Sequence, residues 1–122
     1  MAQAESNKSA EVERILPRHE FEARMKIEIQ RDHKTRVTAG WARDLSENGL
    51  GAFVGADLII GETATLTIPF RDEEELVIPA KVTRKVGTEY GFQFTALSPK
   101  QRNQIRNALS KSKMIPFVPD SE

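Results

Sequence analysis

Residues 21–30 read Phe-Glu-Ala-Arg-Met-Lys-Ile-Glu-Ile-Gln, an alternation of apolar with charged or polar side chains. Successive side chains of a β-strand point to opposite faces, so this period of two places one face on a core and the other in water. Residues 31–34 (Arg-Asp-His-Lys) form a turn, and Val37, Ala39 and Trp41 continue the alternation. The pattern predicts an antiparallel pair of strands ending near residue 44, with Trp41 in the core.

Short strands continue at regular spacing along the chain. Apolar side chains alternate or run together in residues 50–54, 64–70, 76–82 and 90–94. Glycine-containing or acidic turns separate these segments, including the acidic run at 71–75. Six or so strands with little helix between them indicate an antiparallel barrel or sandwich.

The periodicity changes after the sixth strand. Ser98 and Pro99 are suited to a helix N-cap and the first helical position, and Ile105, Ala108 and Leu109 form an apolar stripe. We expect this helix to lie across one opening or flank of the sheet structure. The prolines in residues 114–119 exclude a helix there, which leaves a frayed tail or an apolar strap; we favour the tail.

Composition indicates one domain and excludes several classes of protein. The chain has 122 residues, no cysteine and no net charge. We expect a disordered segment at residues 1–10, one domain at 11–112 and a tail at 113–122. The absence of cysteine, of a long apolar run and of a signal peptide predicts a cytoplasmic protein without a membrane segment. Neutral charge disfavours binding to a nucleic acid polymer, although residues 14–43 carry eight lysine and arginine residues against four acids.

Two short motifs carry recognisable binding chemistry. Residues 14–18 read Arg-Ile-Leu-Pro-Arg, and residues 44–49 read Asp-Leu-Ser-Glu-Asn-Gly. Pro17 restricts the residue before it to extended geometry and stiffens the arm that carries both arginines. Asp44 and Ser46 are two positions apart on a strand end, so they should project from the same face.

A tight turn is expected at the end of the second motif. Asn48 and Gly49 tolerate a positive φ, which we expect the turn to require, and Gly49 has no Cβ to obstruct a ligand. Arm and turn would then converge on one concave surface.

The order and spacing of these motifs resemble the PilZ domain family, from about residue 14 to residue 109. Residues 61–64 (Gly-Glu-Thr-Ala), residues 91–94 (Gly-Phe-Gln-Phe) and the closing helix occur in the order typical of that family. The resemblance implies an all-β fold, a small antiparallel six-stranded β-barrel with a C-terminal α-helix. It also implies that the ligand is cyclic di-GMP, a guanine dinucleotide. The expected ligand-binding residues are Arg14, Arg18, Asp44, Ser46 and Gly49, with the arginines on guanine and phosphate and the other three on the opposite wall.

Arginine and aspartate match the chemistry of such a ligand. Arginine pairs bidentately with guanine O6 and N7, and its planar guanidinium stacks on a purine. An ionised aspartate only accepts hydrogen bonds, so it suits the guanine N–H edge or the orientation of an arginine. Glu13, beside the first motif arginine, should disfavour a second anionic ligand, so we expect one ligand per protein.

The sequence therefore predicts a receptor or adaptor, with an arm at residues 1–18 that becomes ordered on binding and passes the signal to a separate, unidentified partner protein. One alternative is a PilZ-like adaptor that acts without ligand, and another is a nucleic-acid-binding barrel that uses the basic helix. His19 and His33 have no acidic residues at metal-ligand spacing, and no catalytic set of residues stands out. We therefore expect no enzyme activity, no metal and no resident cofactor, and a monomer.

Overall fold

The computed structural model describes residues 17–70, 73–111 and 114–115 of the chain. The predictions made for segment 1–10, for Glu13 and for Arg14 lie outside these residues.

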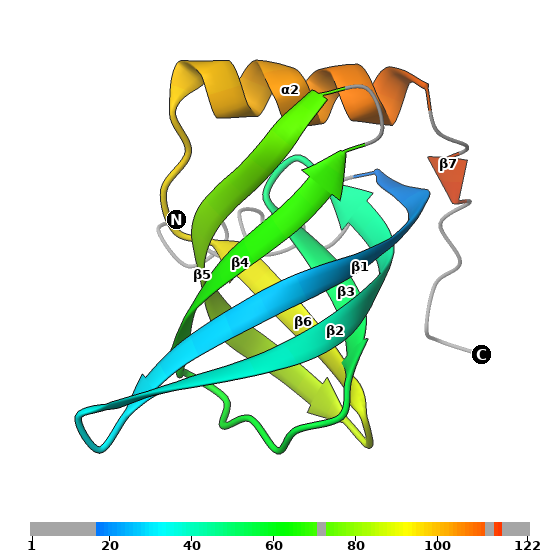
Figure 1. Ribbon diagram of the computed structural model, residues 1–122. Coiled ribbons are helices and arrows are strands. Elements are labelled where there is room, and N and C mark those ends of the chain that lie inside the picture. The colour runs from blue at the N-terminus through cyan, green and yellow to red at the C-terminus, as the bar shows by residue number, and fades with distance from the viewer. Residues whose placement is uncertain (1–16, 71–72, 112–113, 116–122) are drawn as a thin grey trace, which may run out of the picture.

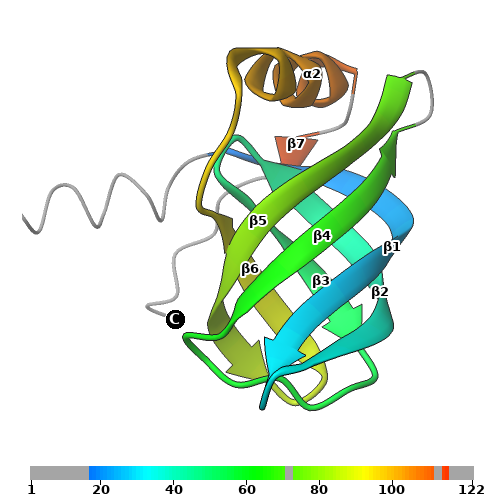
Figure 2. The ribbon, with the colours of Figure 1, turned by 60° about the vertical axis from the view of Figure 1, so that its left-hand side comes forward.

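Six antiparallel strands close into a barrel (Figures 1 and 2). Around the barrel the order is β1-β2-β3-β6-β5-β4, and β1 pairs with both β2 and β4, which closes the sheet. The strands are β1 (Arg18–Arg31), β2 (Lys34–Ser46), β3 (Gly49–Val54), β4 (Thr63–Phe70), β5 (Glu73–Val86) and β6 (Glu89–Phe94). The predicted six-stranded barrel is confirmed.

A two-residue turn sets the register of the first hairpin. Asp32 and His33 have φ values of 53° and 62°, the pair of positive angles that matches the twist of a tight hairpin. The turn places Arg31 opposite Lys34 and sets the pairing of β1 with β2 as far as Ala23 and Ala42, beyond which the register shifts by one residue.

The prediction that Trp41 lies in the core is wrong. The register places Trp41 opposite Arg24 on the outer face, where it is 45% exposed. The inner positions of β2 hold Gly40 and Ala42 instead, because large side chains from β1 fill the space above them. A Cβ added at Gly40 would lie 2.9 Å from Cδ1 of Ile27.

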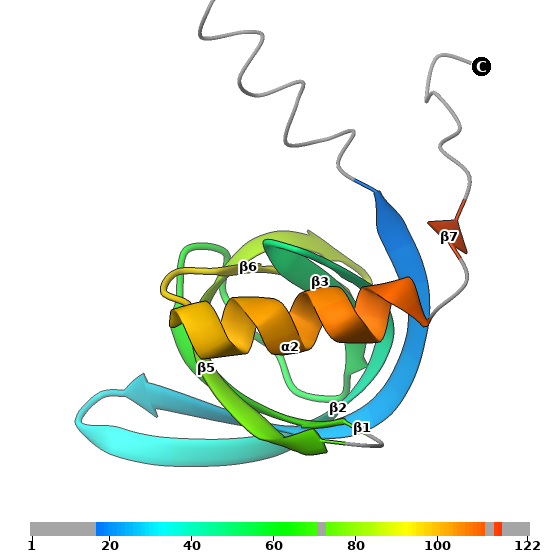
Figure 3. The ribbon, with the colours of Figure 1, turned by 90° about the horizontal axis from the view of Figure 1, so that it is seen from above.

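The helix α2 (Pro99–Ser110) covers one opening of the barrel (Figure 3). The Ser98 hydroxyl accepts a hydrogen bond from the N–H of Gln101, and the Gln101 side chain accepts one from the N–H of Ser98, a capping box. Ile105 and Leu109 point into the barrel and are buried. The predicted helix start and its place across an opening are therefore confirmed. The largest fully buried side chains of the core are Ile27, Leu45, Val54, Leu58, Leu66, Ile68, Ile78, Val82 and Tyr90 of the barrel and its loop, and Ile105 of α2.

A short strand follows the helix. Residues Met114–Ile115 form β7, which pairs antiparallel with Arg18 and His19 at the start of β1. The predicted frayed tail does not describe these two residues, because backbone pairing holds them on the barrel.

The loop between β3 and β4 closes the other end of the barrel and is held by ionic and polar side chains. Arg31 donates two hydrogen bonds of 2.7 Å to the Glu62 carboxylate, which also accepts one from the N–H of Ile59. These bonds lower the pKa of Glu62 below its usual range, the contact with Arg31 being the largest cause. The Tyr90 hydroxyl accepts a hydrogen bond from the N–H of Leu58 and donates one to the carbonyl of the loop residue Ala56.

In the part of the chain that the structure describes, no helix is both long and apolar enough to cross a membrane.

Candidate functional site

A β-bulge in β2 decides which side chains face outward near the turn. Trp41 pairs with Phe53 on the outer face, and the next inner pair is Ala42 with Ala52. Asp44 then pairs with Gly51, so Arg43 is an extra residue on β2. The extra residue shifts the alternation by one.

The shift has opposite effects on the three residues that follow the bulge. Leu45 points into the core and is fully buried. Asp44 and Ser46 lie together on the outer face and line the same cavity. This agrees with the prediction that they project the same way.

Glycines leave a hollow in the outer wall beside these two residues. Gly49 and Gly51 on β3 and Gly91 on β6 all face the same side, and none has a side chain to fill it. The resulting cavity has a volume of about 280 Å³. Its lining residues are Arg18, Asp44, Ser46, Asn48, Gly49, Leu50, Gly51, Thr83, Arg84, Gly91, Phe92 and Gln93.

Gly49 is needed for a different reason from the one predicted. The described residues with positive φ are Asp32, His33, Gly61 and Gly87, so neither Asn48 nor Gly49 adopts that conformation. A Cβ at Gly49 would instead lie 2.2 Å from the carbonyl oxygen of Phe92 on β6. The close approach of two neighbouring strands, rather than the turn, requires glycine.

Asp44 presents an acceptor that the described residues do not satisfy. The residue is 8% exposed, and its Oδ1 atom is buried without a hydrogen-bond partner in the described part of the chain. The guanidinium of Arg18 lies 4.0 Å from Oδ1, close enough for an ion pair but too far for a hydrogen bond. A buried carboxylate oxygen of this kind is a favourable acceptor for a ligand that brings N–H donors, because an unpaired polar atom is costly.

Ser46 uses its hydroxyl to hold the turn. The hydroxyl lies 3.0 Å from Oδ1 of Asn48 and 3.3 Å from the carbonyl oxygen of Gly49. Ser46 lies in the wall of the cavity, while its hydroxyl hydrogen is directed at the Asn48 side chain and the Gly49 carbonyl of the turn.

Arg84 supplies a second cation from the opposite wall. A bulge between Val82 and Arg84 on β5 places Arg84 opposite Gly91, on the outer face beside the cavity. Arg84 and Lys85 are adjacent basic residues near the end of β5, and the sequence alone does not distinguish them. The structure separates them, because the Lys85 ammonium contacts Asp57 and the carbonyl of Leu58. No local motif marks Arg84; its placement depends on the bulge.

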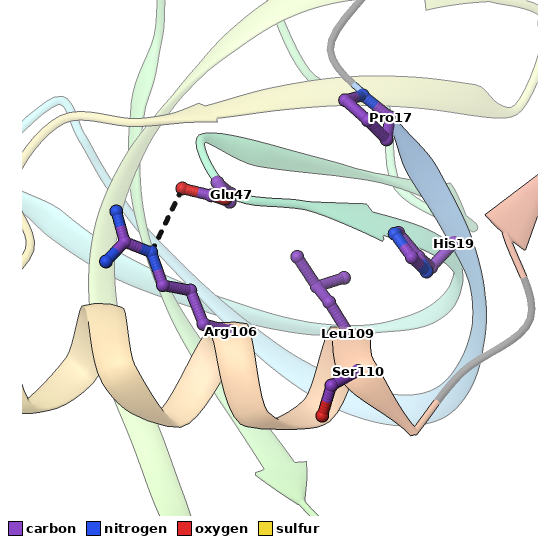
Figure 4. Close-up of a pocket in the computed structure, with 6 residues that line it drawn as sticks. All are labelled: Pro17, His19, Glu47, Arg106, Leu109 and Ser110. Carbon is purple, nitrogen blue, oxygen red and sulfur yellow. Dashed lines mark hydrogen bonds and ion pairs between the residues drawn. The ribbon is translucent and has the colours of Figure 1, made fainter.

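A second cavity, of about 250 Å³, lies between α2, the start of β1 and the β2–β3 turn (Figure 4). His19 and Glu47 line it, whereas their chain neighbours Arg18, Ser46 and Asn48 line the first cavity. Arg106 on α2 donates a hydrogen bond of 3.3 Å to Glu47 across this second space. Its other lining residues are Pro17, Leu109 and Ser110.

Comparison with known proteins identifies the family. The PilZ domain profile matches residues 13–111, most of the chain. The chain belongs to the PilZ family.

Solved PilZ structures share its fold at low sequence identity. The PilZ domain of CeSA from a cellulose-synthesizing bacterium is 20% identical, with a TM-score of 0.60 over 77% of this chain and 95% of that chain. The PilZ domain of YcgR from Escherichia coli, solved with c-di-GMP, is 17% identical, with a TM-score of 0.61 over 77% of this chain and 86% of that chain. MotI/DgrA of Bacillus subtilis, an inhibitor of motility, is 14% identical, with a TM-score of 0.63 over 80% of this chain and 50% of that chain. None of the curated proteins matches the sequence closely.

Four of the five predicted site residues line one cavity of this PilZ domain. Arg18, Asp44, Ser46 and Gly49 lie together, and Arg14 is outside the described residues. The sequence does not predict Gly51 and Gly91 as lining residues, although Gly91 belongs to the family pattern at residues 91–94. Within the described ranges, no group of three or more histidine or acidic residues is arranged to hold a metal ion.

Proposed function

We propose that this chain is a receptor for cyclic di-GMP that binds the ligand in the outer cavity and passes the signal to a separate partner protein. The observation that supports this most directly is the meeting of Arg18 with the unsatisfied Asp44 carboxylate in one cavity. The PilZ domain of YcgR, which shares the fold, was solved with c-di-GMP.

The charges of the cavity suit a dinucleotide with two phosphates. Arg18 and Arg84 supply two cations, and Asp44 supplies one anion. In the proposed complex, Asp44 accepts from the guanine N–H edge, which satisfies its buried oxygen. The two arginines bind guanine O6 and N7 or a phosphate oxygen, where charge-assisted bonds are strongest.

The size of the cavity gives the N-terminal arm a role. A volume of about 280 Å³ lies at the lower end of small-molecule sites, which span about 300–1,000 Å³. Part of a dinucleotide must therefore extend over the rim. Arg18 stands at the rim with its side chain 52% exposed, and Arg14 precedes it on the chain. In this proposal Arg14 closes over the extended part of the ligand and so reshapes the surface.

Isothermal titration calorimetry of the full chain with cyclic di-GMP tests the proposal. Micromolar or tighter binding is expected, weakening as salt screens the phosphate contacts. Arg18→Ala and Arg14→Ala should each weaken binding about 10- to 100-fold, the loss of one charge-assisted contact. Arg24→Ala is the matched control, because Arg24 lies exposed on the same strand and does not line the cavity.

Two results would contradict the proposal. Wild-type protein that releases no heat at high ligand concentration removes the receptor function and favours the adaptor that acts without ligand. If Arg24→Ala and Arg18→Ala weaken cyclic di-GMP binding equally, the cavity is not the binding site.

A further inference from the structure

The first half of β2 has one strand edge without a neighbour. β3 pairs with β2 from Gly40 to Ser46, and β1 pairs with the other edge over its whole length. Residues 34–39 therefore have no strand on the β3 side within the described part of the chain. This end of the β1–β2 hairpin projects beyond the barrel (Figures 1 and 3).

An open edge presents a row of backbone N–H and C=O groups on which another extended segment can pair. We propose that residues 34–39 of β2 receive an extended segment of a partner protein as an added strand, and that this segment alternates acidic and apolar side chains. The inference goes beyond the proposed function, because it assigns the partner's docking surface. It does not require the cavity to bind cyclic di-GMP.

The acidic half of the pattern follows from the charges of β2. The nearest side chains to an added strand are those of the strand it pairs with. Residues 34–39 hold two basic residues, Lys34 and Arg36, and no acid, and the two share one face of the strand. An acidic side chain at every second position of the partner would lie beside them.

The apolar half follows from the opposite face of the same strand. Val37 is 59% exposed there, and Ala39 and Trp41 continue the row. Trp41 pairs with Phe53, which is also exposed and contacts the guanidinium of Arg43 at 5.0 Å from its ring centre. Aromatic and arginine side chains of this kind are enriched among residues that dominate binding energy. The partner's alternate side chains would cover this apolar row.

The same charges argue against a second copy of this chain as the occupant. Two copies paired edge to edge would bring the Lys34 and Arg36 side chains of each close to those of the other. Like charges on neighbouring strands destabilise the pairing. The basic edge therefore selects against self-association and for an acidic strand.

Two eight-residue peptides probe the edge on the full chain, one alternating glutamate with valine and one alternating lysine with valine. Amide hydrogen exchange followed by NMR should show new protection at residues 34–39 with the acidic peptide. The acidic peptide should bind about tenfold more tightly than the basic one, the effect expected of cross-strand charge pairs with Lys34 and Arg36. The double charge reversal Lys34→Glu with Arg36→Glu should invert this preference.

A matched pair of variants separates the edge from general apolar exposure. Val37→Glu should remove acidic-peptide binding, whereas Val77→Glu should not, although Val77 is 54% exposed on β5. Melting curves confirm that each variant is folded. Three results would overturn the proposal. The acidic peptide could leave the amides of residues 34–39 unprotected, or the double charge reversal could leave the peptide preference unchanged. The two valine variants could also affect acidic-peptide binding equally. The proposal is also overturned if the chain without peptide is a dimer in sedimentation velocity and the amides of residues 34–39 are protected in it, because a second copy then occupies the edge.

Discussion

Replacing Gly49 with alanine should destabilise the barrel strongly, although it adds one methyl group on a surface strand. That methyl carbon would lie 2.2 Å from the carbonyl oxygen of Phe92, and ordinary contacts of a Cβ begin at 3.4 Å. Strands β3 and β6 must therefore separate by about 1 Å at this pair. The clash cannot be relieved by rotating a side chain, because the oxygen belongs to the backbone of β6.

The cost has two parts. Forced overpacking costs about 1–3 kcal/mol. The separation also weakens the hydrogen bond of 2.8 Å from the N–H of Phe94 to the carbonyl of Asn48, worth about 1 kcal/mol. We expect Gly49→Ala to lower the free energy of unfolding by about 3 kcal/mol and the Tm by about 12 °C or more.

Gly55→Ala is the matched control for the glycine substitution itself. A Cβ at Gly55 meets nothing within 4 Å. Its unfolding free energy should stay within about 0.5 kcal/mol of the wild-type value. Urea unfolding and thermal melts of both variants measure the difference. If Gly49→Ala and Gly55→Ala have the same Tm, the close contact between β3 and β6 is not the reason that position 49 requires glycine.

Three further substitutions have separable outcomes. Gly51→Ala should leave the Tm within a few degrees but weaken cyclic di-GMP binding in calorimetry, because its Cβ would lie 2.9 Å from the movable Asp44 carboxylate and displace it; unchanged affinity would exclude Asp44 from the site. Glu62→Gln should make the free energy of unfolding, measured by urea denaturation, depend less on pH in the acid range. The lowered pKa of Glu62, caused mainly by Arg31, means that the wild-type pair stabilises the fold above the ordinary glutamate pKa of about 4.3 and loses this stability as the pH falls through the lower folded value. If the free energy of unfolding falls equally with acid in the wild type and in Glu62→Gln, this prediction is wrong. Tyr90→Phe should cost about 1–3 kcal/mol in urea unfolding, because two hydrogen bonds to the loop backbone are lost from a buried site; no change would mean that water replaces them.

Sequence patterns predict the strands well where large apolar residues mark the inner face. The alternation in residues 21–30 and the Ser98 cap identify β1 and α2 because local chemistry and burial agree. In β2 the pattern misleads, since small residues such as Gly40 fill the inner positions and Trp41 lies outside. Cross-strand packing against Ile27 decides this, and no window on β2 alone contains it.

The candidate site divides in the same way. Motif spacing brings Arg18, Asp44 and Ser46 to one cavity, as predicted. Arg84 joins them from β5, about forty residues later on the chain, through a bulge that leaves no mark in the alternation. Contributions of this kind depend on the pairing of distant strands, so they require coordinates.

The extra residue at Arg43 ties the bulge to the residue count of this strand. If the strand paired regularly at its present length, Leu45 would turn to solvent, and Asp44 and Ser46 would enter the aliphatic core. Removing one residue at the bulge would instead give strict alternation with Leu45 still inward and Asp44 still outward. A homologue can therefore keep the acidic wall in two ways, with the bulge or with one residue fewer between Trp41 and Asp44, but not with a regular strand of the same length.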